Sequence, residues 1–313
     1  MNSNVNVVHA EAAEAGRSLG YDLYVFRGAI DAAQFPSPVR EGFAHAAARR
    51  LPRQTPDRFG RKWLQLRCNA YARGRAFDER ITPAVLQAMD VAECPVTRMT
   101  LTHGQLLDSD WSVDRLNNDG GYASNNLCVM STRANKAKGR RGFDEVLRLS
   151  QRPTATDGLE PVEWQRLAAL MHGPCFAAAP QDAPLLAHAV PVTSHRLLLA
   201  AQQVQHVFCT LAASQAGKNR LVKAMRAAST SDGATWRLCT LADRVHDGLK
   251  QLDRACDVWL QPGVMEAFAH WRDAHDAAAW GRVAEAARRL AGGQQVAPCR
   301  LQSWHLGSRG YAH

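Results

Sequence analysis

The chain has 313 residues, of which 46% are hydrophobic and 21% charged, so its composition is globular and excludes wholesale disorder. Its formal net charge of +9 favours polyanionic partners such as nucleic acid, without identifying one. No uncharged apolar run reaches the roughly 18 residues that span a membrane, and residues 1–16 lack the basic-then-apolar order of a signal peptide. We therefore expect a cytoplasmic protein with no membrane partner.

The first predicted region, residues 1–92, is basic and mostly helical. A short apolar stretch, Tyr21–Phe26, is expected to form a strand. Further along, apolar residues recur at spacings of three and four, which predicts a helix with one buried face. The residues of that face are Phe59, Trp63, Leu66 and Ala70.

Residues 49–75 carry nine basic side chains and a single acidic one, Asp57. This density favours a surface that follows phosphates, where each neutralised phosphate releases counterions and adds salt-dependent affinity. The alternative is a solvated charged face over an aromatic core. Under the first interpretation we expect nucleic acid to contact Arg61, Lys62 and Arg67.

The most informative segment lies between residues 94 and 142. Alternation over Trp111–Leu116 predicts a strand, and the Gly- and Asn-rich residues 117–125 predict a wide loop. Leu127–Met130 is expected as a second strand, and the residues from Thr132 onward combine N-cap chemistry with a basic helix. The predicted order is strand, loop, strand, helix.

This segment resembles the ββα-metal finger of HNH endonucleases, also called His-Me finger nucleases. Members of that family carry an Asp-His pair late in the first strand, a Gly-containing loop, an Asn-Leu pair opening the second strand, and Asn-x-x-Lys on the helix. Many also have an upstream Cys-Pro. The matching residues here are Asp114-Arg115, Gly120-Gly121, Asn126-Leu127 and Asn135-x-x-Lys138, preceded by Cys94-Pro95.

The resemblance covers only this segment, and together with the patterning of the rest of the chain it predicts an α+β fold with three parts. A small ββα-metal finger over residues 93–149 is embedded in a mostly α-helical chain. The basic region 1–92 precedes it, and a helical C-terminal domain over residues 150–313 follows it. Helices are predicted in the last part at His195–Ala213, Lys218–Ala228, Thr235–Leu260 and Val264–Leu290, with Ser194 as a cap of the first.

The resemblance also implies chemistry with one divalent cation, Mg²⁺ or Mn²⁺, held against the scissile phosphate. Asp114 and Asn135 would ligate this cation, with Ser131 as a weaker candidate, and Asn126 would brace the loop that holds the general base. On the helix, Arg133, Lys136 and Lys138 would contact phosphates.

The sequence departs from the family at Arg115, which occupies the position where active members have the histidine that acts as general base. Arginine stays protonated and cannot take a proton from water, although it can clamp a phosphate. The base must then come from elsewhere. His103 is the only histidine within the motif region, and the loop acids Asp108, Asp110 and Asp119 are further candidates.

The cysteines and the C-terminal histidines point to no metal. The eight cysteines are scattered without a C-x-x-C pair, and the histidines of residues 172–305 form no i, i+4 ligand pair with a neighbouring acid. In the C-terminal part a stripe with helical spacing is expected to face the core. Its members are Trp236, Leu238, Leu241, Val245, Leu249 and Leu252.

We therefore expect a metal-dependent HNH-type DNA endonuclease that hydrolyses phosphodiester bonds, of phage or mobile-element descent. The alternative is a catalytically degenerate HNH-fold protein that only binds DNA. Arg115 favours the alternative, whereas Asp114, Asn126 and Asn135 together favour the nuclease. In a third interpretation the helical C-terminal domain binds a protein partner and dictates what the protein does.

Overall fold

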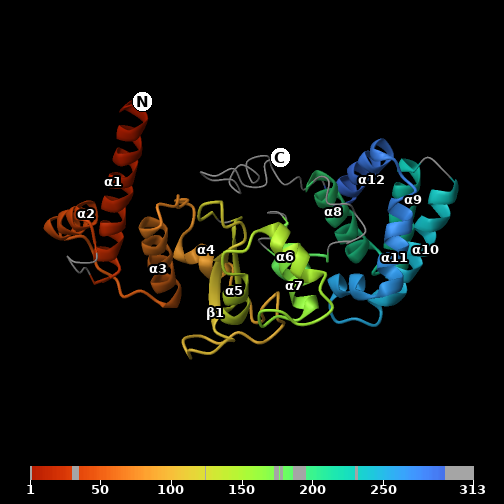
Figure 1. Ribbon diagram of the computed structural model, residues 1–313, viewed down its shortest axis with the longest axis horizontal. Coiled ribbons are helices and arrows are strands. Elements are labelled where there is room, and N and C mark those ends of the chain that lie inside the picture. The colour runs from red at the N-terminus through yellow and green to blue at the C-terminus, as the bar shows by residue number, and fades with distance from the viewer. Residues whose placement is uncertain are drawn as a thin grey trace.

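The chain forms helices arranged along one long axis on both sides of a small two-stranded sheet. Figure 1 shows α1 and α2 at one end of this axis, β1 with α5 near the middle and α8–α12 at the other end. The predicted α+β class is confirmed in this sense, as a mostly helical chain with a small antiparallel sheet. In this computed structural model the described residues are 2–29, 35–123, 125–172, 176, 179–185, 195–229 and 232–292.

The elements follow the predicted order of a helical region, a hairpin and a second helical region. They are α1 (Asn2–Val25), α2 (Ser37–Ala48), α3 (Arg58–Ala72), α4 (Pro83–Ala88), β1 (Trp111–Arg115), β2 (Leu127–Ser131), α5 (Thr132–Lys138), α6 (Phe143–Ser150), α7 (Pro161–Met171), η2 (Pro180–Asp182), α8 (His195–Leu211), α9 (Gln215–Ala228), α10 (Asp232–Leu249), η3 (Ala255–Leu260), α11 (Pro262–Arg272) and α12 (Ala277–Leu290).

The strand that we predicted at Tyr21–Phe26 is wrong, because these residues form the end of α1 and the turn that follows it. Leu19 and Leu23 are buried four residues apart, so the burial of this stretch follows helical and not alternating spacing. Helix α1 packs on α2 where Gly20 meets Gly42. A β-carbon on either glycine would collide with the backbone of the other helix.

Helix α3 confirms the predicted apolar stripe and leads into the hairpin. Its N-cap, Asp57, accepts a hydrogen bond from the Gly60 amide, and Phe59, Trp63, Leu66 and Ala70 are buried. The Trp63 indole donates to the carbonyl of Ile81 over 2.6 Å, which ties α3 to the segment before α4.

The hairpin and the helix after it also agree with the predicted order. Strands β1 and β2 pair antiparallel, with Asp114 opposite Cys128 and Val113 opposite Val129. All five residues of β2 are buried. The cap of α5 is Ser131 and not Thr132, since the Ser131 hydroxyl accepts from the Ala134 amide.

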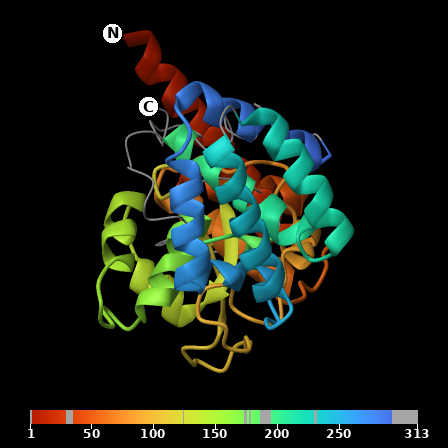
Figure 2. The same cartoon turned by 90° about the vertical axis from the view of Figure 1, so that its right-hand side faces the viewer.

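The C-terminal half is helical as predicted, but with different breaks. The expected helix Thr235–Leu260 ends at Leu249 and is followed by η3, and the expected helix Val264–Leu290 is divided between α11 and α12. Figure 2, in which this end of the molecule faces the viewer, shows these helices grouped together in front of the rest of the chain. Ser194 lies outside the described residues.

The central and C-terminal parts share ion pairs. Arg98, which follows the Cys94-Pro95 opening, pairs with Asp257 of η3 over 3.3 Å, and Arg254 pairs with Glu93. Helix α6, which we assigned to the finger, packs on α7 of the next part.

Among the described helices, none combines the length and apolarity that a membrane span requires.

The prediction that Trp236 faces the core is wrong. Its side chain is 69% exposed, whereas Leu238, Leu241 and Val245 of the same helix are buried. Taking Leu238 as the centre of the buried face, Trp236 lies about 160° away at 100° per residue. It therefore points to solvent on the face opposite the core.

Candidate functional site

Asp114 of β1 is held by Lys138, the last residue of α5. The Lys138 side chain is 0% exposed, and its Nζ lies 2.8 Å from Oδ2 of Asp114. It also donates to the Arg115 carbonyl over 2.8 Å and to Oδ1 of Asn118 over 3.0 Å. An ammonium has three donors, so this one is fully used within the fold. Burial raises the pKa of Asp114, and the charge of Lys138 opposes that rise.

Asn135 lies on the same side of the hairpin as Asp114. Its amide donates to the Ser112 hydroxyl over 2.7 Å, and Ser112 and Asp114, two residues apart on β1, share one face of the strand. Ser131 does not join them as a free donor. Its hydroxyl is fully buried, caps α5 and lies 3.3 Å from that of Thr97.

The donors around Asp114 do not fit a divalent cation. Mg²⁺ and Mn²⁺ sites are built from carboxylate and other oxygens. Of the two expected ligands, Asp114 and Asn135, only Asp114 is a carboxylate. The buried ammonium of Lys138 already occupies its neighbourhood and compensates its charge. Within the described part of the chain, no group of three or more His, Cys, Asp or Glu side chains could hold a metal ion.

Arg115 is anchored in the hairpin loop. Its guanidinium donates to the carbonyls of Asn118, over 3.1 Å, and Gly120, over 2.8 Å, and lies 4.9 Å from the ring centroid of Tyr122. Burial lowers the pKa of Arg115, and the nearby charges of Arg75 and Arg73 lower it further.

Asn126 braces the loop between the strands. Its side chain is fully buried, and its amide donates to the carbonyls of Asn117 and Gly121 over 3.0 and 2.8 Å. Its Oδ1 accepts from the Asn117 amide over 2.8 Å. The predicted bracing geometry is therefore present, although the group that it fixes is Arg115 and not a general base.

His103 lies away from Arg115. Its exposed ring is 6.0 Å from that of Trp111, the first residue of β1, whereas Asp114 and Arg115 end the strand. Trp111 and Asp114 are three residues apart on this strand, which corresponds to about 10 Å. His103 is therefore at the opposite end of the strand from Asp114 and Arg115.

The loop acids likewise have structural roles. Asp110 accepts hydrogen bonds from the Thr102 hydroxyl and from backbone amides of residues 105–107, and these bonds lower its pKa. Asp108 pairs with Lys136, and Asp119 is exposed. Asp119 lies between Asn118 and Gly120, whose carbonyls accept from Arg115, so it is the one loop acid of the three next to the Arg115 loop contacts.

Three of the predicted phosphate contacts are engaged inside the fold. Arg67 pairs with Asp22, Arg133 pairs with Glu163 over 2.8 Å, and Lys138 is buried. A phosphate can reach these groups only by displacing their partners.

The other three predicted contacts are more accessible. Arg61 is exposed and donates to the Pro56 carbonyl, and Lys136 is 70% exposed in its pair with Asp108. Lys62 is half-buried, with its Nζ 5.6 Å from the centroid of the Trp111 ring, and burial lowers its pKa.

Sequence reasoning did not single out the two arginines that approach the hairpin loop. Arg73 and Arg75 flank Gly74, which has a φ of +58° and turns the chain at the end of α3. Both are exposed, and Nη1 of Arg75 donates to the Asp119 carbonyl over 3.3 Å. With Arg115 they form a set of three guanidinium groups, which we call the arginine cluster. The Arg-Gly-Arg sequence after an amphipathic helix was the available signal.

Comparison with known proteins adds no identity. No protein-family model, no curated protein and no solved structure matches the chain. The likeness to HNH nucleases therefore depends on the residues of the motif alone.

Proposed function

We propose that this protein binds duplex DNA through the phosphate backbone, with the arginine cluster at the centre of the contact, and does not hydrolyse it. The observation that carries the proposal is the hydrogen bond by which Arg75, just after α3, reaches the loop that holds Arg115, with the exposed Arg73 two residues before it. A guanidinium presents a planar fork of donors that matches phosphate oxygens, and it keeps its charge at any working pH. The exposed pair can meet a strand directly, while Arg115 supports the loop.

The absence of hydrolysis follows from the surroundings of Asp114. A carboxylate that binds a metal must present its oxygens to that metal, but Asp114 lies against the buried ammonium of Lys138. Arg115 cannot act as a base. The HNH-like hairpin and helix then act as a support for phosphate-binding side chains.

The nuclease is the second candidate, because Asp114 and Asn135 share one side of the hairpin and Asn126 braces the loop. For hydrolysis, Lys138 would have to leave Asp114 when DNA and metal arrive. The two candidates differ in one assay, the nicking of supercoiled plasmid.

Replacing both Arg73 and Arg75 with alanine should weaken binding to duplex DNA by about tenfold or more at moderate salt. The slope of log affinity against log salt should become shallower by about two, since each lost phosphate contact removes about 0.9. Fluorescence anisotropy with a labelled duplex measures both quantities.

A matched control for this variant is Arg40→Ala/Arg152→Ala. These arginines are exposed, lie outside the cluster and remove the same charge. If both double variants lose the same affinity, DNA responds to net charge only and the cluster has no special role.

Purified wild type should not nick supercoiled plasmid with Mg²⁺, Mn²⁺ or EDTA. Arg115→His, which restores the Asp-His pair of the resemblance, should also stay inactive, because Lys138 still compensates Asp114. Gel electrophoresis of the plasmid reads the result. Metal-dependent nicking by wild type that is lost in Asp114→Asn would replace this proposal with the nuclease.

A further inference from the structure

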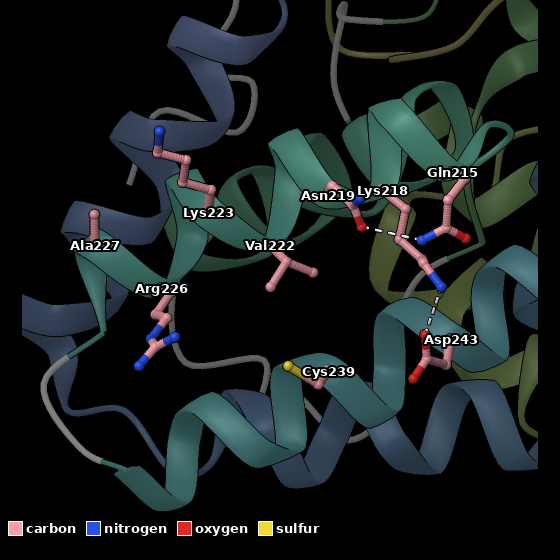
Figure 3. A pocket seen from close by; sticks show the side chains of 9 residues that line it. All are labelled: Gln215, Lys218, Asn219, Val222, Lys223, Arg226, Ala227, Cys239 and Asp243. Carbon is pink, nitrogen blue, oxygen red and sulfur yellow. Dashed lines mark hydrogen bonds and ion pairs between the residues drawn. The ribbon is translucent and has the colours of Figure 1, made fainter.

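A groove of about 750 Å³ runs between α9 and α10, far along the chain from the hairpin. Figure 3 shows its lining side chains from both helices. Lys218 of α9 pairs with Asp243 of α10 over 2.6 Å near one end, and Arg226 lies near the other. The groove is open to solvent and contains both polar and apolar lining residues.

The groove carries a net positive charge, because only one of its basic side chains is paired with an acid. Helix α9 carries four basic residues and no acidic residue. Asp243 neutralises Lys218. The exposed Lys223 and Arg226 line the groove, and neither side chain forms a hydrogen bond or ion pair with another residue that the structure describes. Two cations that line the groove are therefore without a counter-ion among the described residues.

Trp236 adds a flat apolar surface on α10, outside the groove lining itself. It is 69% exposed and belongs to the same side of α10 as Cys239 and Asp243, which line the groove. It precedes Cys239, which lines the groove, by about one turn of α10. An exposed indole costs solvation free energy, which a partner that covers the ring would recover.

We propose that the groove between α9 and α10 binds single-stranded nucleic acid, with backbone phosphates on Lys223 and Arg226 and an unpaired base stacked on Trp236. Cations that follow a backbone beside an aromatic platform are the two parts of a single-strand site. In a duplex the bases are already stacked, so their faces cannot reach the indole. An acidic peptide would use the cations but leave Trp236 without a role. This site is separate from the arginine cluster and does not depend on it.

The full-length protein is titrated into labelled dT12 and, separately, into a labelled hairpin duplex. Trp236→Ala should weaken dT12 binding by about tenfold, the size of one base–aromatic stack. Lys223→Ala/Arg226→Ala should weaken it similarly and reduce its salt dependence. Duplex binding should stay within about twofold of wild type in both variants.

Two matched controls separate the groove from general effects. Trp236→Phe keeps an aromatic face and should retain most of the affinity for dT12. Arg220→Ala removes an exposed charge of α9 outside the groove lining and should change little. Because Trp236 is exposed, its loss should not unfold the chain, and circular dichroism checks this.

Three outcomes would overturn the single-strand site. One is dT12 affinity that is unchanged in Trp236→Ala, and another is an equal loss in Arg220→Ala. The third is a poly-glutamate peptide that competes for the groove as well as dT12 does and is insensitive to Trp236. Unchanged duplex binding in the Arg73/Arg75 variant would contradict only the proposed function, so its failure and the failure of the single-strand site can be told apart.

Discussion

Replacing Lys138 with methionine should lower the free energy of unfolding by about 3–5 kcal/mol, because the Asp114 carboxylate is then buried without its counter-ion. The substitution also removes the donor to the Arg115 carbonyl and to the Asn118 side chain. Chemical denaturation at neutral pH measures the loss. It is the largest single-residue effect that we expect in the hairpin region.

The matched control is Lys218→Met. Lys218 also pairs with an aspartate, Asp243, but that carboxylate is 62% exposed and stays hydrated when its partner is removed. The expected cost is about 1 kcal/mol or less. The double variant Asp114→Asn/Lys138→Met should recover much of the loss, since no buried charge is left unpaired. Equal losses in Lys138→Met and Lys218→Met would contradict a buried compensating pair.

The Lys138→Met variant should also depend on pH in a defined direction. Burial raises the pKa of Asp114, and without Lys138 nothing of similar size opposes that rise. A carboxyl whose folded pKa lies above its unfolded value near 4 favours the folded state in its protonated form. The added destabilisation is therefore small below about pH 4 and grows as the pH rises toward the folded pKa.

Asn126→Asp should destabilise the chain by roughly 3 kcal/mol or more and disorder the loop between the strands. The substitution replaces the two amide donors to the Asn117 and Gly121 carbonyls with an oxygen, in a fully buried position. Hydrogen exchange of the amides at residues 117–121 measures the loop, and urea denaturation measures stability.

Asn219→Asp is the control for this substitution. Asn219 is exposed on α9, where the same chemical change should alter stability by less than about 0.5 kcal/mol. Because the loop positions Arg115, Asn126→Asp should also weaken duplex binding when the protein is kept folded at low temperature. Normal loop protection and normal stability in Asn126→Asp would show that Asn126 is not the brace.

The local pattern of the sequence was sufficient for the order of elements around the candidate site. The i, i+3, i+4 spacing of Phe59, Trp63 and Leu66 marks the buried face of α3, because helical period and burial are properties of one segment. The hairpin and α5 were predicted for the same reason, from alternation, a Gly-rich loop and a basic helical run. Tyr21–Phe26 was mistaken because a short apolar run fits a strand or a helix equally well.

The sequence alone could not determine what surrounds Asp114. Lys138 lies 24 positions further along, and whether its ammonium faces a phosphate or a buried carboxylate depends on how α5 packs on β1. The same holds for Arg75, which donates to the Asp119 carbonyl only because the end of α3 approaches the hairpin loop. Trp236, by contrast, could have been placed from the sequence, because its spacing of two residues from Leu238 sets it on the opposite face of the helix.

Segment by segment, then, the residues determined helices, strands and the density of positive charge, since these depend on neighbours within a few positions. The tertiary structure decided which charges are compensated and which are free. An ion pair between distant segments forms when packing brings its two groups within a few ångströms, and burial then strengthens the pairing and removes it from solvent. Lys138 is paired in this way, whereas Arg73, Lys223 and Arg226 are exposed to a partner.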